Sequence, residues 1–231
     1  MAPPPPDRTT MAGMIHNANQ VLDAALSPET KAIPRKMFQD VKGIVLLSIV
    51  EVGFVLSGNV GTGIILAKTE KGEWGPPCAI GLTGVGWGLL VGGSVKDVMI
   101  FLTNETAVQG ITHPNGLKLG GQAEVTLGYG RTGALDLNLS HAGSSGTLAV
   151  AFTKGVFLGV SVEGAVMGIR HAANNAFYGE TRTPNDILAG KVDLPSGDHA
   201  SLMKDVYEKL EKLSKGVHEE PAPEEKEETK E

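Results

Sequence analysis

The sequence predicts an α+β domain: a strongly bent, mostly antiparallel, glycine-rich β-sheet or barrel with N-terminal and C-terminal helices packed on it. Helical periodicity dominates the two ends of the 231-residue chain, whereas residues 43–169 mostly alternate short β-branched runs with glycine. Of the 31 glycines, 28 lie between residues 43 and 190, and glycine within strands marks bends and bulges. The candidate strands follow one another without room for helical crossovers, which favours antiparallel pairing.

The N-terminal part begins with a proline-rich lead over residues 1–9, which we expect to be disordered. An amphipathic helix follows over residues 10–27, with Thr10 as its N-cap. Its apolar residues recur at helical spacing: Met11, Met14, Ile15, Ala18, Val21, Leu22, Ala25 and Leu26. This stripe either packs on the sheet or lies on a membrane, and both interpretations stay open. A further helical turn is expected after Pro34, over residues 35–41.

The central region consists of short candidate strands. They are 44–50, 52–57, 62–69, 77–82, 85–91, 96–103, 122–128, 134–139, 147–153, 156–162 and 164–170. Residues 43–67 are apolar over a length that fits a transmembrane helix. Glu51 near the middle of this stretch and its many glycines argue against such a helix. Gly58-Asn59 instead predicts a tight turn, so a buried β-hairpin is favoured.

The remaining elements follow from local signals. Short helices are expected at 104–109, 171–178 and 184–189, an irregular loop at 110–121, and a longer helix at 198–214. Residues 10–214 therefore form one domain, and residues 215–231 form an acidic tail that we expect to be disordered.

Charge and cysteine content exclude several classes of protein. The net charge is −6, and the seven glutamates and two lysines from Glu219 onward account for −5 of it. The nearly neutral remainder lacks the basic excess of a nucleic-acid-binding domain. One cysteine, Cys78, forms no internal disulfide and suits a reducing compartment. The N-terminus lacks a secretory signal pattern, so we expect a cytoplasmic protein.

No set of residues predicts catalysis, a cofactor or a metal site. Gly128–Gly133 matches GxGxxG, but another strand-like run follows it where the dinucleotide fingerprint requires a helix. His141 lies near serines without a nucleophile elbow or a third triad member. The six histidines share no metal-ligand spacing. We therefore expect a protein that is not an enzyme.

The distinctive local charge is a basic helical segment that contains Lys31, Arg35, Lys36 and Lys42. It follows the amphipathic helix directly, and each base near an anionic leaflet contributes about 1 kcal/mol of attraction. The residues alone leave two interpretations open: the bases are ordinary surface residues, or the segment contacts an anionic membrane or an acidic filament.

A series of spaced glycine, tryptophan and tyrosine motifs resembles the SYLF domain, found in endocytic proteins of the yeast LAS-seventeen-binding type and in bacterial relatives. The resemblance covers about residues 15–191. It rests on Ile33-Pro34, Val41–Ile44, Val52–Phe54, Gly61–Gly63, Gly72–Pro77, Gly84–Gly88, Asp97–Ile100, Gly159–Gly164, Phe177–Gly179 and Asp186–Gly190.

The resemblance implies a binding module, peripheral at membranes, that recognises phosphoinositide-containing membranes and, in the yeast-like members, actin filaments. It assigns membrane insertion to the helix residues Met11, Met14, Ile15 and Leu22, and anionic contact to Lys31, Arg35, Lys36 and Lys42. A second hypothesis is a barrel that holds a lipid or another hydrophobic small molecule between its apolar strand faces.

Overall fold

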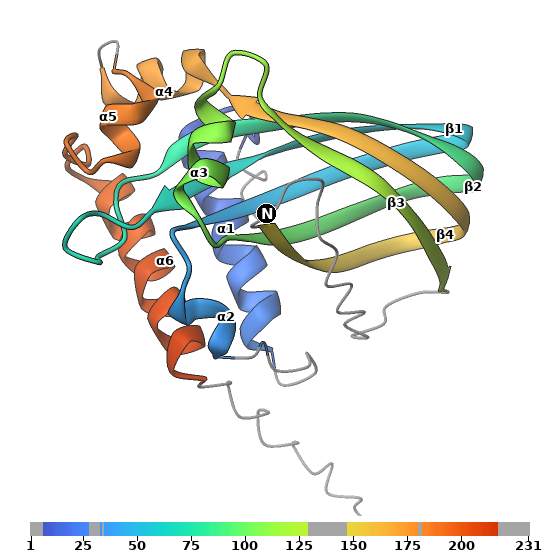
Figure 1. Cartoon of the computed structure of the whole chain (residues 1–231), viewed down its shortest axis with the longest axis horizontal. Helices are drawn as coiled ribbons and strands as arrows, with labels where there is room; N and C mark the ends of the chain where they lie inside the picture. Colours follow the sequence, from blue (N-terminus) through green and yellow to red (C-terminus); the bar gives the residue numbers. More distant parts are fainter. Residues whose placement is uncertain (1–6, 28–32, 34, 129–146, 180–181, 217–231) are drawn as a thin grey trace, which may run out of the picture.

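A computed structural model describes residues 7–27, 33, 35–128, 147–179 and 182–216. Four strands form one antiparallel sheet in the order β1-β2-β4-β3, with helices from both chain ends packed against it (Figure 1). The elements are α1 (Met11–Leu26), α2 (Lys36–Gln39), β1 (Gly43–Ala67), β2 (Cys78–Leu102), α3 (Glu105–Thr112), β3 (Leu117–Gly128), β4 (Thr147–Ile169), α4 (His171–Tyr178), α5 (Pro184–Leu188) and α6 (Asp198–Lys215). The α+β class is as predicted.

The strands are much longer than expected. β1 and β2 have 25 residues each and pair from Gly43↔Leu102 to Ile65↔Cys78, with one shift of register between Phe54 and Leu56. The predicted turn at Gly58-Asn59 is wrong, because these residues continue β1 and pair with Val85 and Gly84. Gly58 therefore does not end the strand. The short candidates within 44–69, 77–103 and 147–170 therefore merge into β1, β2 and β4.

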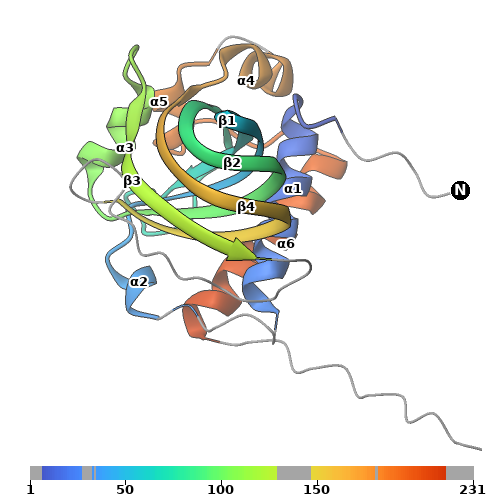
Figure 2. The ribbon, with the colours of Figure 1, turned by 90° about the vertical axis from the view of Figure 1, so that its right-hand side faces the viewer.

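The β1–β2 ribbon curls until the two ends of β1 meet, which Figure 2 shows as a nearly closed loop. Gly63 makes this closure possible: a Cβ atom there would lie 2.0 Å from the Leu46 carbonyl oxygen. At Gly61 a Cβ atom would lie 2.9 Å from the Ile49 side chain. Only glycine permits so close an approach of the two backbones. The predicted bending by glycine is thus confirmed, but within strands.

The two faces of the curled sheet carry separate cores. On the outer face, α1 and α6 pack against Ile44, Leu46 and Phe101. On the inner face, side chains of β1 and β2 meet α3 and α5, through residues such as Ile111 and Ile187. Strand alternation explains the division, because successive side chains point to opposite faces.

Hydrogen bonds fix the helices that follow β4. Asn174 of α4 is buried; its side-chain oxygen accepts from the Ala79 amide at 2.7 Å, and its side-chain nitrogen donates to the Ala79 carbonyl at 3.3 Å. Tyr178 donates to the Pro77 carbonyl at 2.6 Å, and Tyr207 of α6 donates to the Gly75 carbonyl at 3.0 Å. Hydrogen bonds from α4 and α6 therefore fix the loop between β1 and β2.

The other local predictions have mixed outcomes. Thr10 caps α1 as expected, by accepting from the Gly13 amide, and the four predicted helices after β2 are present. The irregular loop at 110–121 is wrong, because α3 extends to Thr112 and β3 starts at Leu117. The candidate strand at 134–139 lies outside the described residues. None of the helices described has the length and apolar character needed to cross a bilayer.

Candidate functional site

Arg35 and Lys36 are exposed because α2 is anchored from its other side. Phe38 of α2 is buried and packs edge-to-face on Phe101 of β2, with ring centroids 5.0 Å apart. With the apolar side of this short helix in the core, Arg35 and Lys36 point to solvent. The sequence thus places two cations on a rigid support.

Lys42, the residue before β1, is the third exposed cation of this part of the chain. Its backbone is fixed on both sides: its amide donates to the Leu102 carbonyl at 2.7 Å, and its carbonyl accepts from the Lys68 amide at 2.8 Å. Val41 before it is buried in the core, whereas the Lys42 side chain is exposed.

Arg35, Lys36 and Lys42 are called the cation surface below. Within the described residues, no carboxylate forms an ion pair with any of the three. Asp40, close in sequence, is exposed and makes no such pair within this part of the chain. Lys31, the fourth predicted base, lies outside the described residues. The three side chains thus keep their charge available for an external anion.

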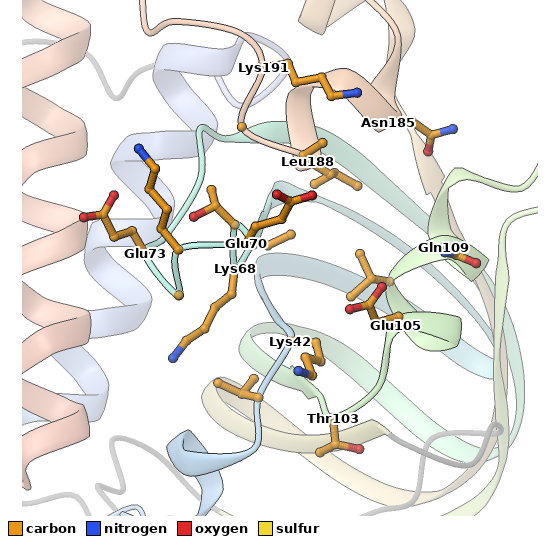
Figure 3. Close-up of a pocket in the computed structure, with 18 of the residues that line it drawn as sticks. Lys42, Lys68, Glu70, Glu73, Thr103, Glu105, Gln109, Asn185, Leu188 and Lys191 are labelled. Atoms are coloured by element: carbon orange, nitrogen blue, oxygen red, sulfur yellow. The ribbon is translucent and has the colours of Figure 1, made fainter.

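A cavity of about 1150 Å³ opens beside Lys42, between the β1–β2 loop, α3 and α5. Figure 3 shows its charged residues: Lys42, Lys68 and Lys191 together with Glu70, Glu73 and Glu105. Lys71 and Asp40 also line it, so cations and acids are balanced. Nothing in the sequence signalled this cavity, because its walls come from four separated segments. Lys42 therefore belongs both to the cation surface and to a cavity whose four cations are balanced by four acids, whereas Arg35 and Lys36 do not line this cavity.

The four apolar residues assigned to membrane insertion lie in the core. Met14, Ile15 and Leu22 are 0% exposed and Met11 is 2% exposed, packed between β1 and α6. Burying four such side chains stabilises the fold by roughly 6–12 kcal/mol, comparable with a typical domain's total stability of about 5–15 kcal/mol. The structure therefore shows the docked arrangement of α1, in which these side chains have no access to a bilayer.

The described residues offer no set of groups for catalysis. Cys78 is buried, and burial raises the pKa of its thiol to about 12, so the thiolate is scarce at neutral pH. No group of three or more metal-ligating side chains gathers in the described ranges. The GxGxxG match beyond Gly128 and the serines around His141 lie outside those ranges.

The inner face of the curl is filled by side chains where the structure describes them. Val45, Leu47 and Ile100 are fully or almost fully buried there. Glu51 and Lys96 form an ion pair at 3.0 Å on the same face, with side chains 3% and 10% exposed. Ala67 and Leu188 belong to this inner-face core and also line the cavity described above. The hypothesis of an internal ligand stays a prediction.

Comparison with known proteins gives a consistent family match. The profile of a family described as "Ysc84: Las17-binding protein actin regulator" matches residues 83–212, more than half of the chain. Over 178 residues the chain is 35% identical to Protein YSC84 and 34% identical to LAS seventeen-binding protein 3, both of Saccharomyces cerevisiae. Over 185 residues it is 33% identical to SH3 domain-containing YSC84-like protein 1 of Bos taurus.

These alignments cover 77%, 77% and 80% of this chain, but 37%, 38% and 52% of the relatives. The chain thus spans about half or less of the curated relatives it matches. No solved structure gives a significant match.

Proposed function

Since the chain belongs to the Ysc84 family of Las17-binding protein actin regulators, we propose that it is a non-enzymatic actin-regulating module that attaches to anionic membranes. The attachment uses the cation surface of Arg35, Lys36 and Lys42, together with Lys31, and its target is phosphoinositide lipid. The module works in the cytoplasm, at the periphery of membranes.

The observation that carries this proposal is the exposure of three cations on a fixed backbone, without a paired carboxylate in the described residues. A fixed cation spends no binding free energy on ordering its own backbone. Each base near an anionic leaflet contributes about 1 kcal/mol, so three bases together give roughly a hundredfold gain in affinity. Arginine also binds phosphate oxygens with two parallel hydrogen bonds.

Vesicle co-sedimentation tests the membrane part. We expect the chain to bind vesicles doped with a phosphoinositide and to lose about a hundredfold in affinity as Arg35→Gln/Lys36→Gln/Lys42→Gln. The matched control is Lys118→Gln/Lys191→Gln/Lys204→Gln, which removes three exposed charges elsewhere and should bind like the unaltered chain. Equal binding by the two triple variants would reject the proposed surface.

The family description supports the actin part, and an acidic filament presents the same kind of surface as an anionic membrane. Pelleting with filamentous actin tests it with the same two variants. If the amount of protein in the pellet with filaments does not exceed the amount without them, direct actin binding is contradicted. Membrane attachment is tested separately by the vesicle assay.

A further inference from the structure

The C-terminal end of α6 lies against the cation surface. α6 ends at Lys215, and Gly216 follows in the left-handed conformation with φ of 70°. A Cβ atom on Gly216 would lie 3.0 Å from the Arg35 guanidinium carbon, in contact with the neighbouring nitrogen atoms. Figure 1 likewise shows the end of α6 beside α2. The chain therefore leaves the described fold at Arg35.

The residues that continue from this point have the complementary charge. Residues 217–231 contain seven glutamates and two lysines, a net charge of −5. Pro221 and Pro223 lie between the first two glutamates and the rest. Fifteen residues span at most about 50 Å. Lys36 adjoins Arg35 and Lys42 follows α2 closely, so the glutamates reach the whole surface.

We propose that residues 217–231 bind back on the cation surface and cover Arg35, Lys36 and Lys42. The glutamate carboxylates take the positions that lipid phosphates would otherwise occupy. Because the tail is tethered at Gly216, its effective concentration is in the millimolar range, so individually weak ion pairs are populated together. The chain's own tail thus covers the cation surface and competes with lipid phosphates for it. The masking of membrane binding rests on the proposed function, whereas the contact itself does not.

A spin label at the end of the tail tests the contact. Thr229→Cys leaves the tail charge unchanged, and the buried Cys78 does not compete for the label because its side chain is inaccessible. We expect the amide signals of Lys36–Gln39 to broaden, and the broadening to fall in Arg35→Gln/Lys36→Gln/Lys42→Gln and at high salt. It should persist in Lys118→Gln/Lys191→Gln/Lys204→Gln. Tethering alone would broaden both triple variants equally, which would overturn the proposal.

A mixing experiment tests whether the tail that binds belongs to the same chain or to a second copy. Isotope-enriched chains without a spin label are mixed with spin-labelled chains of natural isotope content. Broadening at α2 that depends on this mixing would show that the tail of a second copy binds, and would overturn the intramolecular contact. Its absence, together with charge-dependent broadening within one chain, supports the proposal.

Vesicle binding tests the masking. Replacing the seven tail glutamates with glutamine should raise affinity for phosphoinositide vesicles about threefold to tenfold. When Arg35, Lys36 and Lys42 are already glutamine, the tail has no cations to cover, so the same replacement should change affinity less than about twofold. The effects of the two sets of substitutions are then not additive. An equal gain in both backgrounds overturns masking and indicates general repulsion. If no variant binds vesicles, the proposed function and the masking both fail, while the spin-label result still decides the contact.

Discussion

Gly63 has no side chain, and this absence allows the β1–β2 ribbon to close on itself. Gly63→Ala would place its Cβ atom 2.0 Å from the Leu46 carbonyl oxygen, and two backbones must separate to relieve the clash. We expect a loss of at least about 3 kcal/mol in the free energy of unfolding, measured by denaturant titration.

The matched control is Gly58→Ala in the same strand, where a Cβ atom would meet nothing within 4 Å. We expect that variant to keep its stability within about 0.5 kcal/mol. Similar losses at the two positions would show that closure of the ribbon does not depend on Gly63.

Cys78 gives the fold a defined response to alkaline pH. Burial raises the pKa of its thiol from 9.0 to about 12, and burial also raises the pKa of Tyr207 from 10.0 to about 12. The unfolded chain loses these protons first as pH rises. Stability is therefore full below about pH 9 and decreases as pH increases toward 12.

Denaturant titrations between pH 8 and pH 11 measure this decrease. Cys78→Ala should reduce the slope above pH 9, because the variant has no thiol to ionise. An unaltered slope in the variant would assign the alkaline loss to other groups.

At the scale of elements, α1 acts as a core helix. Leu22 is 0% exposed and lies in the core cluster that α1 shares with α6. Leu22→Ala should therefore cost about 2–5 kcal/mol in the free energy of unfolding, while the folded variant keeps its affinity for anionic vesicles.

Gln20→Ala on the exposed side of α1 is the control, with an expected change within about 0.5 kcal/mol. The contrary result would be a Leu22→Ala protein of unchanged stability that no longer binds vesicles, since that result would place Leu22 at the membrane.

The helices illustrate how much local structure the sequence determines. Thr10 and Asn104 cap α1 and α3 as their residue types suggest, and Thr183 followed by Pro184 marks the start of α5. Each signal is contained within one helical turn, so no distant contact has to be known.

At the scale of the whole molecule, the strand lengths depend on distant contacts and could not be predicted in the same way. Gly58-Asn59 fits a turn or a bent strand equally well, and only pairing with β2 decides for the strand. The amphipathic stripe of α1 likewise fits a bilayer or a core, and the apolar faces of β1 and α6 decide for the core. The residue types of the cation surface could be predicted, whereas its anchoring by Phe38 and its contact with Gly216 could not.

The account as a whole holds that the chain meets an anionic membrane through the cation surface while α1 stays in the core. Amide hydrogen exchange with and without phosphoinositide vesicles tests this most directly. The account predicts that amides of α1 remain equally protected in both states, and that residues 35–42 gain protection on the vesicles. Loss of protection in α1 on binding, with residues 35–42 unchanged, would contradict it.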